Sequence, residues 1–401
     1  MRRDIARTIR RGTGVALAGT LAVAALVVPA APASADATIT ANEQTFYGYY
    51  RLDAIHSSGY TGEGVTIALV DGPINTQIPE LAGARIQSYS PCAVDSQDKS
   101  WDHGTVIAQV ISSPQFGVAP GANLRAYTLS FAGETTGSDC ALGQWGRGYS
   151  DLALLIEDAL NDGVDVITTS SSYPSDYEGM RWALARAIAS KVPVVACVGN
   201  DSTSNSTDWL PAWGGVVGVG AIETNGRPSD YQNWGRPLST AALARPLARS
   251  GVSQERGEWW GTSFASPVVA GSLALSMQRW PRATGNQIMQ GLARTGVGGN
   301  GGEWNQYTGY GALDIYAMLT TNPTSFPDEN PFMDKGTNTV PSRQDVQDYI
   351  DGVVDPRVVM NDNSYEYLGF DERLALSRDH DYPTHLGTSP RYHQKFQAQK
   401  K

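Results

Sequence analysis

The stretch GTSFASPVVAGSLALSMQ, residues 261–278, is the one around which the rest of this chain is organised. It contains no charged residue, yet its serines, Thr262 and Pro267 interrupt it too often for a membrane span. Its small residues allow other elements to approach closely, so we expect a helix buried on all sides. Ser263 stands where that helix should begin. Two interpretations are open for it: the N-cap of a core helix, or a nucleophile whose own N–H helps to hold an oxyanion.

Strand-like and helix-like segments alternate through the middle of the chain. Residues 65–70 form a continuous apolar, β-branched run, which is typical of a strand buried on both faces of a parallel sheet. Further strands are expected at 124–131, 164–169, 192–198 and 214–222, with helices at 151–160 and 180–188. Such alternation indicates right-handed βαβ crossovers. We therefore predict an α/β fold of three layers, with a mostly parallel sheet between helices.

Polar residues stand at the ends of these elements. Asp71 follows the strand at 65–70, Asn200 follows the strand at 192–198, and His103 opens a helical apolar pattern. Ligands of open α/β sheets gather outside the carboxyl ends of the strands, so these side chains are well placed for chemistry. Each residue alone also fits a plainer role, as a turn former or a surface histidine.

Together these residues give the order Asp, His, Ser along the chain, and the sequence around each one carries a resemblance. The segments are VDGPI at 70–74, HGT at 103–105, VVACVGN at 194–200 and GTSFASP at 261–267. On these four motifs the chain resembles the subtilisin-like serine peptidases over residues 45–320. The resemblance implies the subtilisin-like form of the predicted fold.

The resemblance also implies roles for individual residues. Ser263 is expected to be the nucleophile, His103 its base, and Asp71 the group that fixes the imidazole. The Asn200 amide and the Ser263 N–H are expected to hold the oxyanion of the tetrahedral intermediate. The substrate, an extended polypeptide, is expected to pair with the strand end that carries Ser170, Ser171 and Ser172.

The function implied is therefore that of a serine endopeptidase working through an acyl-enzyme. Ser172 stands near a position where the family usually has glycine, which favours selective processing over broad digestion. Two alternatives stay open: a catalytically degenerate module that only binds peptides, and a transpeptidase or macrocyclase of peptide maturation. The motif Asp71-Gly72-Pro73 also lacks the hydroxyl residue that commonly follows the family's aspartate.

Composition and targeting restrict the setting. The net charge of −10 argues against nucleic acid or an anionic membrane as the main partner. An arginine-rich start, an apolar stretch at 14–28 and Ala-Ser-Ala at 33–35 form a secretory signal, which we expect to end at residue 35. The mature protein is then secreted, and no later apolar run is long enough to hold it in a membrane.

The remaining expectations concern boundaries, cysteines and cofactors. We expect a signal peptide, a short leader, a peptidase domain, a linker and an extension of unknown role, at residues 1–35, 36–46, 47–320, 321–342 and 343–401. Cys92 and Cys140 lie in polar loops of an exported chain, which favours a disulfide, whereas Cys197 lies in an apolar run and should be a buried thiol. The sequence has no zinc-type motif, so no cofactor is required. Calcium is an expectation from the resemblance alone.

Overall fold

The structure of the chain, a computed structural model, describes residues 37–142, 147–148, 151–171, 177–204, 209–243, 245–299, 302–336 and 339–351. The predicted signal at 1–35, Ser172 and most of the predicted extension, 352–401, lie outside these residues.

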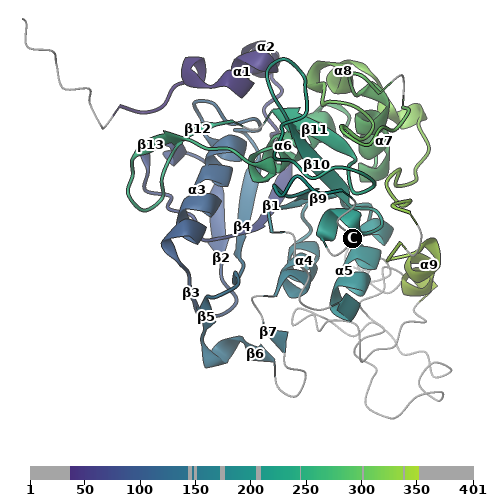
Figure 1. The fold of residues 1–401 in the computed structure, drawn as a ribbon, viewed down its shortest axis with the longest axis horizontal. Coiled ribbons are helices and arrows are strands. Elements are labelled where there is room, and N and C mark those ends of the chain that lie inside the picture. Colours follow the sequence, from purple (N-terminus) through teal and green to yellow (C-terminus); the bar gives the residue numbers. More distant parts are fainter. Residues whose placement is uncertain are drawn as a thin grey trace, which may run out of the picture. The chain divides into compact units, whose positions relative to one another are not determined.

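A seven-stranded sheet forms the centre of the described chain (Figure 1). All of its neighbouring strands pair in parallel, in the order β11-β10-β9-β8-β1-β4-β2. The strands are β1 Thr66–Asp71, β2 Ile86–Tyr89, β4 Asn123–Thr128, β8 Val166–Thr169, β9 Val194–Cys197, β10 Val217–Ile222 and β11 Thr240–Leu243. The predicted α/β architecture is confirmed, since helices cover both faces of this sheet.

Side chains alternate between the two faces of each strand and so build two cores. In β1, Ile67 and Leu69 join the core under α3 Asp98–Ser112 and α6 Ser266–Arg279, while Ala68 and Val70 join the core of the opposite face. That second core is completed by α4 Leu152–Asn161 and α5 Tyr177–Ala189, which lie together in Figure 1. A strand that needs apolar residues on both sides reads as an unbroken apolar run, which is why the sequence shows it.

Smaller elements surround α6. The helices α7 Gly285–Thr295 and α8 Ile315–Thr320 pack against it, and α1 Thr45–Tyr49 and α2 Leu52–Ser57 contribute to the same core. Among the described helices, none combines the length and the apolar character needed to cross a bilayer.

Two segments in which no strand was predicted contain strands. The segment 81–101 holds the edge strand β2, and 223–260 holds β11 and the hairpin of β12 Leu247–Arg249 with β13 Arg256–Glu258. Two further antiparallel pairs of short strands, β3 Val94–Asp95 with β5 Thr135–Thr136 and β6 Ala141–Leu142 with β7 Arg147–Gly148, were also not predicted. These strands are short, and β2 leaves three of its four residues exposed, so no apolar run marks it.

The segments predicted as leader and linker are packed rather than loose. Ile39 and Phe46 are buried in the core, and the Ile39 amide donates to Glu80 Oε1 at 3.0 Å. In the expected linker, Phe332 is buried and the Lys335 ammonium donates to Pro237 O at 3.0 Å and to Ser239 Oγ at 2.8 Å. The start of the expected extension forms α9 Arg343–Asp351, which packs on α5. These buried residues are separated by polar ones in the sequence, so no apolar pattern predicted that the segments would pack.

Candidate active site

The carboxyl edge of the sheet brings the candidate residues together. Asp71 is the last residue of β1, Ser170 directly follows β8, and Asn200 follows β9. His103 lies inside α3, five residues after that helix begins, and not at a helix start as expected. The helix begins at Asp98 because Glu134, from a distant loop, accepts from the Gln97 N–H and the Ser100 hydroxyl at its first turn. Parallel strands leave their carboxyl ends at one edge, so residues remote in sequence become neighbours.

Asp71 and His103 form a direct pair. The imidazole Nδ1 lies 2.7 Å from Asp71 Oδ1, and the Gly72 N–H donates to the same oxygen at 2.7 Å. The Asp71 side chain is fully buried, whereas that of His103 keeps 25% of its surface exposed. A carboxylate on Nδ1 fixes the tautomer in which Nε2 carries the lone pair and faces outward as an acceptor.

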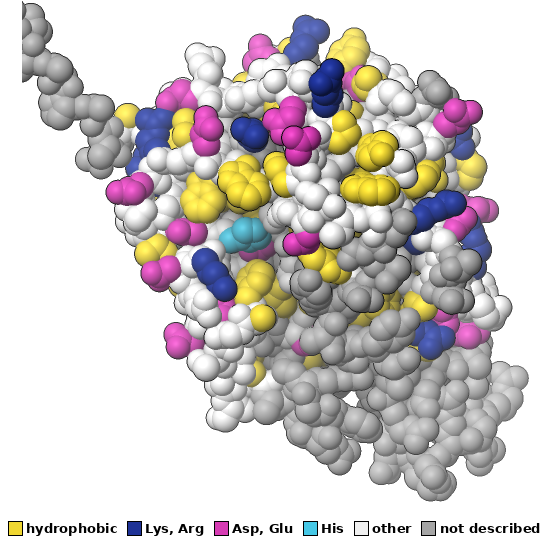
Figure 2. All heavy atoms as spheres, in the orientation of Figure 1, with side chains coloured by type: hydrophobic (Ala, Val, Ile, Leu, Met, Phe, Trp, Pro, Cys, Tyr) yellow, Lys and Arg dark blue, Asp and Glu magenta, His cyan; other side chains and the backbone are white. Residues whose placement is uncertain are grey.

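The charge of Asp71 also sets the basicity of the imidazole. Burial by itself lowers the pKa of His103, but the negative charge and the hydrogen bond of Asp71 outweigh it, and the pKa is raised above the ordinary value. Aromatic rings flank the imidazole, with centroids 5.7 Å away for Phe264 and 6.3 Å for Phe131. The space-filling view shows an exposed histidine with hydrophobic side chains gathered on either side of it (Figure 2).

Steric crowding explains why a glycine, Gly72, follows Asp71. A Cβ at Gly72 would lie 2.0 Å from the Ser100 carbonyl oxygen, so no hydroxyl residue fits there. Among the described residues, Asp71 Oδ2 consequently has no hydrogen-bonding partner although it is buried. The close approach of α3 to the end of β1 therefore explains the departure from the Asp-Ser or Asp-Thr pattern.

Asn200 is held in one orientation by the residue before Ser263. Its Oδ1 accepts from the Thr262 N–H at 2.8 Å and from the Thr262 hydroxyl at 3.0 Å. Thr262 Oγ1 in turn accepts from the Gly199 N–H at 3.1 Å. With the acceptor atom engaged, the Nδ2 amide is the group left to donate, and no hydrogen bond within the described part of the chain uses it.

The glycine between Trp260 and Thr262 is needed for this arrangement. Gly261 has a φ of 134°, a conformation that side chains of L-residues rarely adopt. A Cβ there would also come within 3.3 Å of Asn200 Nδ2. The Asn200 Nδ2 amide therefore faces a glycine, where no side chain occupies the space beside it.

Ser263 does not cap the core helix. It lies in a 3-10 turn, Thr262–Phe264, and α6 begins only at Ser266 with Ala265 at the N-cap position and a proline in its first turn. The N-cap interpretation is therefore wrong. Pro267, in the first turn of α6, has no backbone N–H. The helix start therefore has one donor fewer that a capping serine could satisfy.

The turn is fixed by its backbone, and the hydroxyl of Ser263 is left with weak contacts. Ser263 O accepts from Ser170 Oγ at 2.8 Å. Ser263 Oγ lies 4.0 Å from Cys197 Sγ. Ser263 and His103 are both described, and no hydrogen bond joins their side chains. In structures without substrate, hydrogen bonds between base and nucleophile are often long and tighten on binding.

The predicted substrate wall is described only in part. The Ser170 hydroxyl faces inward, where it contacts Ser263 O and lies 3.2 Å from Ser266 Oγ, so it supports the serine turn. The Ser171 N–H donates to Thr169 Oγ1 at 3.1 Å. Ser172 lies outside the described residues. The wall therefore stays a prediction, with Ser171 as its described member.

Sequence reasoning missed the residues that orient the candidates. Thr262 directs Asn200, and Phe131 and Phe264 flank His103. Thr262 was visible inside GTSFASP as a hydroxyl next to the serine, but its partner lies 62 positions away. Nothing local marks Phe131.

The three cysteines and the carboxylate and imidazole side chains were also candidates for a disulfide or a metal site. Cys92 and Cys140 are joined in a disulfide with their Cα atoms 5.0 Å apart, and Cys197 is a buried thiol. Within the part of the chain that the structure describes, no three His, Cys, Asp or Glu side chains are grouped closely enough to hold a metal ion. Calcium binding stays an expectation from the family resemblance.

A parallel sheet with an Asp–His pair and a fixed amide at its carboxyl edge defines the class of α/β serine hydrolases with the order Asp, His, Ser. The sequence profile of the subtilase family matches residues 62–311, and the chain belongs to that family. Subtilisin E from Bacillus subtilis (strain 168) is 30% identical over 276 residues, covering 67% of this chain and 68% of the relative. Members of the family are serine endopeptidases, and so is this chain.

Solved structures agree on the fold. MycP1, described as a serine protease and component of a type VII secretion system, is 27% identical with a TM-score of 0.57, covering 73% of this chain and 91% of that one. The prenylagaramide maturation protease PagA is 23% identical with a TM-score of 0.53, covering 67% and 96% of the two chains. At that identity the second likeness concerns the fold alone.

Proposed function

We propose that Asp71, His103 and Ser263 are the triad that carries this peptidase activity. The observation that supports it most is the 2.7 Å contact of His103 Nδ1 with the buried Asp71, which leaves Nε2 as an outward base. Ser263 lies in the turn whose first residue, Thr262, holds Asn200, so nucleophile and amide belong to one rigid unit. Rigid placement of both groups lowers the cost of ordering them during reaction.

The proposed chemistry has two halves. Ser263 Oγ attacks the peptide carbonyl while His103 Nε2 takes its proton, and Asp71 stabilises the imidazolium without itself being protonated. The oxyanion accepts from Asn200 Nδ2 and from the Ser263 N–H. His103 then gives the proton to the leaving amine as the C–N bond breaks, and water hydrolyses the acyl-enzyme by the same route.

We propose that the substrate is an extended polypeptide and that cleavage is selective. Ser171 lies two residues after β8 at the carboxyl edge of the sheet, where an extended substrate can pair with the strand end as an added strand. The half-buried ring of Phe131 beside His103 favours apolar substrate residues near the cut. Backbone pairing does not depend on the substrate's side chains, so we assign the selectivity to this apolar surface.

We propose an extracellular site of action, with cleavage of the signal after Ala35. The disulfide of Cys92 with Cys140 supports it, because such bonds persist in oxidising surroundings. Mass spectrometry of the secreted chain should find a new N-terminus at Asp36. A chain retained in the cytoplasm with both thiols reduced would contradict this location.

A fluorophosphonate probe tests the triad assignment. We expect the purified chain to be labelled and Ser263→Ala to lose the label, because only an activated serine reacts with the probe. Ser272→Ala is the matched control, because Ser272 is a buried serine of α6 and its hydroxyl donates to Val268 O, away from the serine turn. Equal labelling of wild type and Ser263→Ala would refute the assignment, and no labelling of folded wild type would favour a module that only binds peptides.

A second test decides whether water or an amine takes the acyl group. With a peptide substrate and an added amino-acid amide, we expect hydrolysed product to dominate in mass spectra. A product carrying the added amine in large excess would instead favour the transpeptidase alternative.

A further inference from the structure

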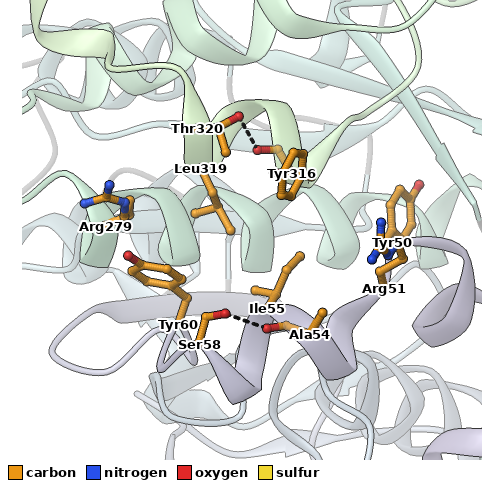
Figure 3. Close-up of a pocket in the computed structure, with 10 residues that line it drawn as sticks. All are labelled: Tyr50, Arg51, Ala54, Ile55, Ser58, Tyr60, Arg279, Tyr316, Leu319 and Thr320. Atoms are coloured by element: carbon orange, nitrogen blue, oxygen red, sulfur yellow. Dashed lines mark hydrogen bonds between the residues drawn. The ribbon is translucent and has the colours of Figure 1, made fainter.

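A second concave site lies among helices α2, α6 and α8. A cavity of about 340 Å³ is lined by the turn between α1 and α2, by α2 and the residues after it, by the last residue of α6 and by α8 (Figure 3). That volume is within the range of pockets that bind ligands. The candidate active site lies at the start of α6, and its last residue, Arg279, lines this cavity. Since α6 has 14 residues, the two sites are roughly 20 Å apart along the helix.

The middle of the pocket is apolar. Ile55 from α2 and Leu319 from α8 face one another there and are each only 5% exposed (Figure 3). Tyr60 lies beside them, and the ring of Tyr316 is 66% exposed at the rim. An apolar side chain entering between Ile55 and Leu319 would remove their remaining surface and its own from water.

The two ends of the pocket are cationic. Figure 3 shows Arg279 at one end, beside Tyr60, and Arg51 at the other, beside Tyr50. The Arg279 guanidinium lies 4.2 Å from the ring centre of Trp280 and 5.6 Å from that of Tyr60, which holds it in place. Within the described part of the chain, neither arginine forms an ion pair or a hydrogen bond through its guanidinium.

This local charge runs against that of the whole protein. The chain has a net charge of −10, yet none of the ten residues that line the pocket is acidic. Asp314 is the acidic residue whose charge reaches Tyr50, and its Oδ1 already accepts from the Ala317 N–H as the N-cap of α8. Two arginines whose guanidinium groups form no ion pair, on an acidic protein, indicate that the pocket favours anionic groups.

We propose that this pocket is a docking site for a peptide segment in which one large apolar side chain lies between two acidic ones. The apolar side chain fills the space between Ile55 and Leu319, and the two carboxylates pair with Arg51 and Arg279. Arginine binds carboxylates through paired N–H donors, which gives such contacts direction as well as strength. A small molecule with one carboxylate would leave one guanidinium unpaired, so a peptide with two fits better. The site is separate from the triad and binds without any turnover.

A fluorine NMR titration of the full chain tests this proposal. The probe is N-acetyl-Glu-(4-fluoro-Phe)-Glu amide, and the protein carries Ser263→Ala so that no probe is cleaved. We expect saturable binding, with the Gln-(4-fluoro-Phe)-Gln analogue about tenfold weaker because it lacks both charges. Higher salt should weaken the first probe and leave the second unchanged.

Variants locate the binding. Arg51→Gln and Arg279→Gln should each weaken the acidic probe several-fold, and Ala54→Glu should do so without removing any contact of the fold. Arg282→Gln is the matched control, because Arg282 is exposed near Arg279 but does not line the pocket. Binding that is equal for both probes, or unchanged in the double arginine variant, would overturn the proposal. Equally tight binding of N-acetyl-4-fluorophenylalanine, with one carboxylate, would also overturn it and indicate a small anion instead.

Discussion

The two ends of α6 differ in how their polar groups are used. At the start, positioning contacts orient the candidate residues: Thr262 donates to Asn200 Oδ1, and the Ser170 hydroxyl donates to Ser263 O. At the end, the guanidinium groups of Arg279 and of Arg51 across the pocket form no ion pair and no hydrogen bond among the described residues. Positioning hydrogen bonds fix the geometry of a reactive site, whereas charges without ion-pair partners are available to a ligand. The comparison teaches that one helix separates a rigid reactive site from an open binding site.

The largest expected effect comes from a change in the triad, near the start of α6. Asp71→Asn should lower kcat by about 10⁴-fold, the magnitude known for triad peptidases, because the imidazole then takes the wrong tautomer. Asp102→Asn is the matched control one residue before His103. Asp102 accepts from Ser250 Oγ and the Val252 N–H, contacts that an asparagine oxygen can keep. Steady-state hydrolysis of a quenched peptide measures both, and similar losses in the two variants would contradict the assignment.

The next effect concerns the amide. Asn200→Ala should reduce kcat by about 10²–10³-fold with little change in KM, a magnitude established for subtilisin itself. Thr262→Val removes the hydroxyl that contacts Asn200 Oδ1 and keeps the N–H contact, so a loss of about tenfold or less is expected. A Thr262→Val loss as large as that of Asn200→Ala would mean that Thr262 acts by itself and not through the amide.

The pH profile sharpens the role of the buried carboxylate. Catalysis needs the neutral imidazole, and Asp71 raises the pKa of His103 above its ordinary value of 6.5. The acid limb of kcat/KM should therefore have its midpoint above 6.5, with about a tenfold loss per pH unit below it. Asp71→Asn removes the charge that raises the pKa, so the midpoint of its residual activity should move down. A wild-type midpoint at or below 6.5 would contradict this account.

The smallest expected effect concerns the far end of the helix. Arg51→Gln and Arg279→Gln should leave kcat/KM on a short peptide within about twofold, since both residues are exposed or half-buried and remote from Ser263. Hydrolysis of the same quenched peptide measures this. A loss beyond tenfold in a folded variant would mean that α6 couples its two ends and that they are not separate sites.

The sequence predicts some elements better than others for physical reasons. Strands buried on both faces, such as β1 and β9, are unbroken apolar runs and were found. β2 is an exposed edge strand and β11 consists of threonine, alanines and leucine, so neither carries a distinctive pattern. Periodicity located helices well but not their first residues, which is why His103 and Ser263 were each placed at a helix start.

The candidate site divides along the same line. The residue types of Asp71, His103, Asn200 and Ser263 followed from ordered motifs. Their orientation did not, because the partners of Asn200 and Ser263 come from positions far away in the chain. The distal pocket was not foreseen at all, since it draws Arg51, Arg279 and Tyr316 from three helices or their ends and no local pattern joins them.

The central claim is that Asp71, His103 and Ser263 act as one unit, and a double-variant comparison tests it most directly. Peptide hydrolysis is measured for Ser263→Ala, for His103→Ala and for the two changes combined, with folding checked by circular dichroism. In a working triad the second change costs little once the first is made, so all three variants should be slower than wild type by a similar factor, about 10⁶-fold as known for subtilisin. Losses that multiply in the double variant would show that the two residues act independently and would contradict the account.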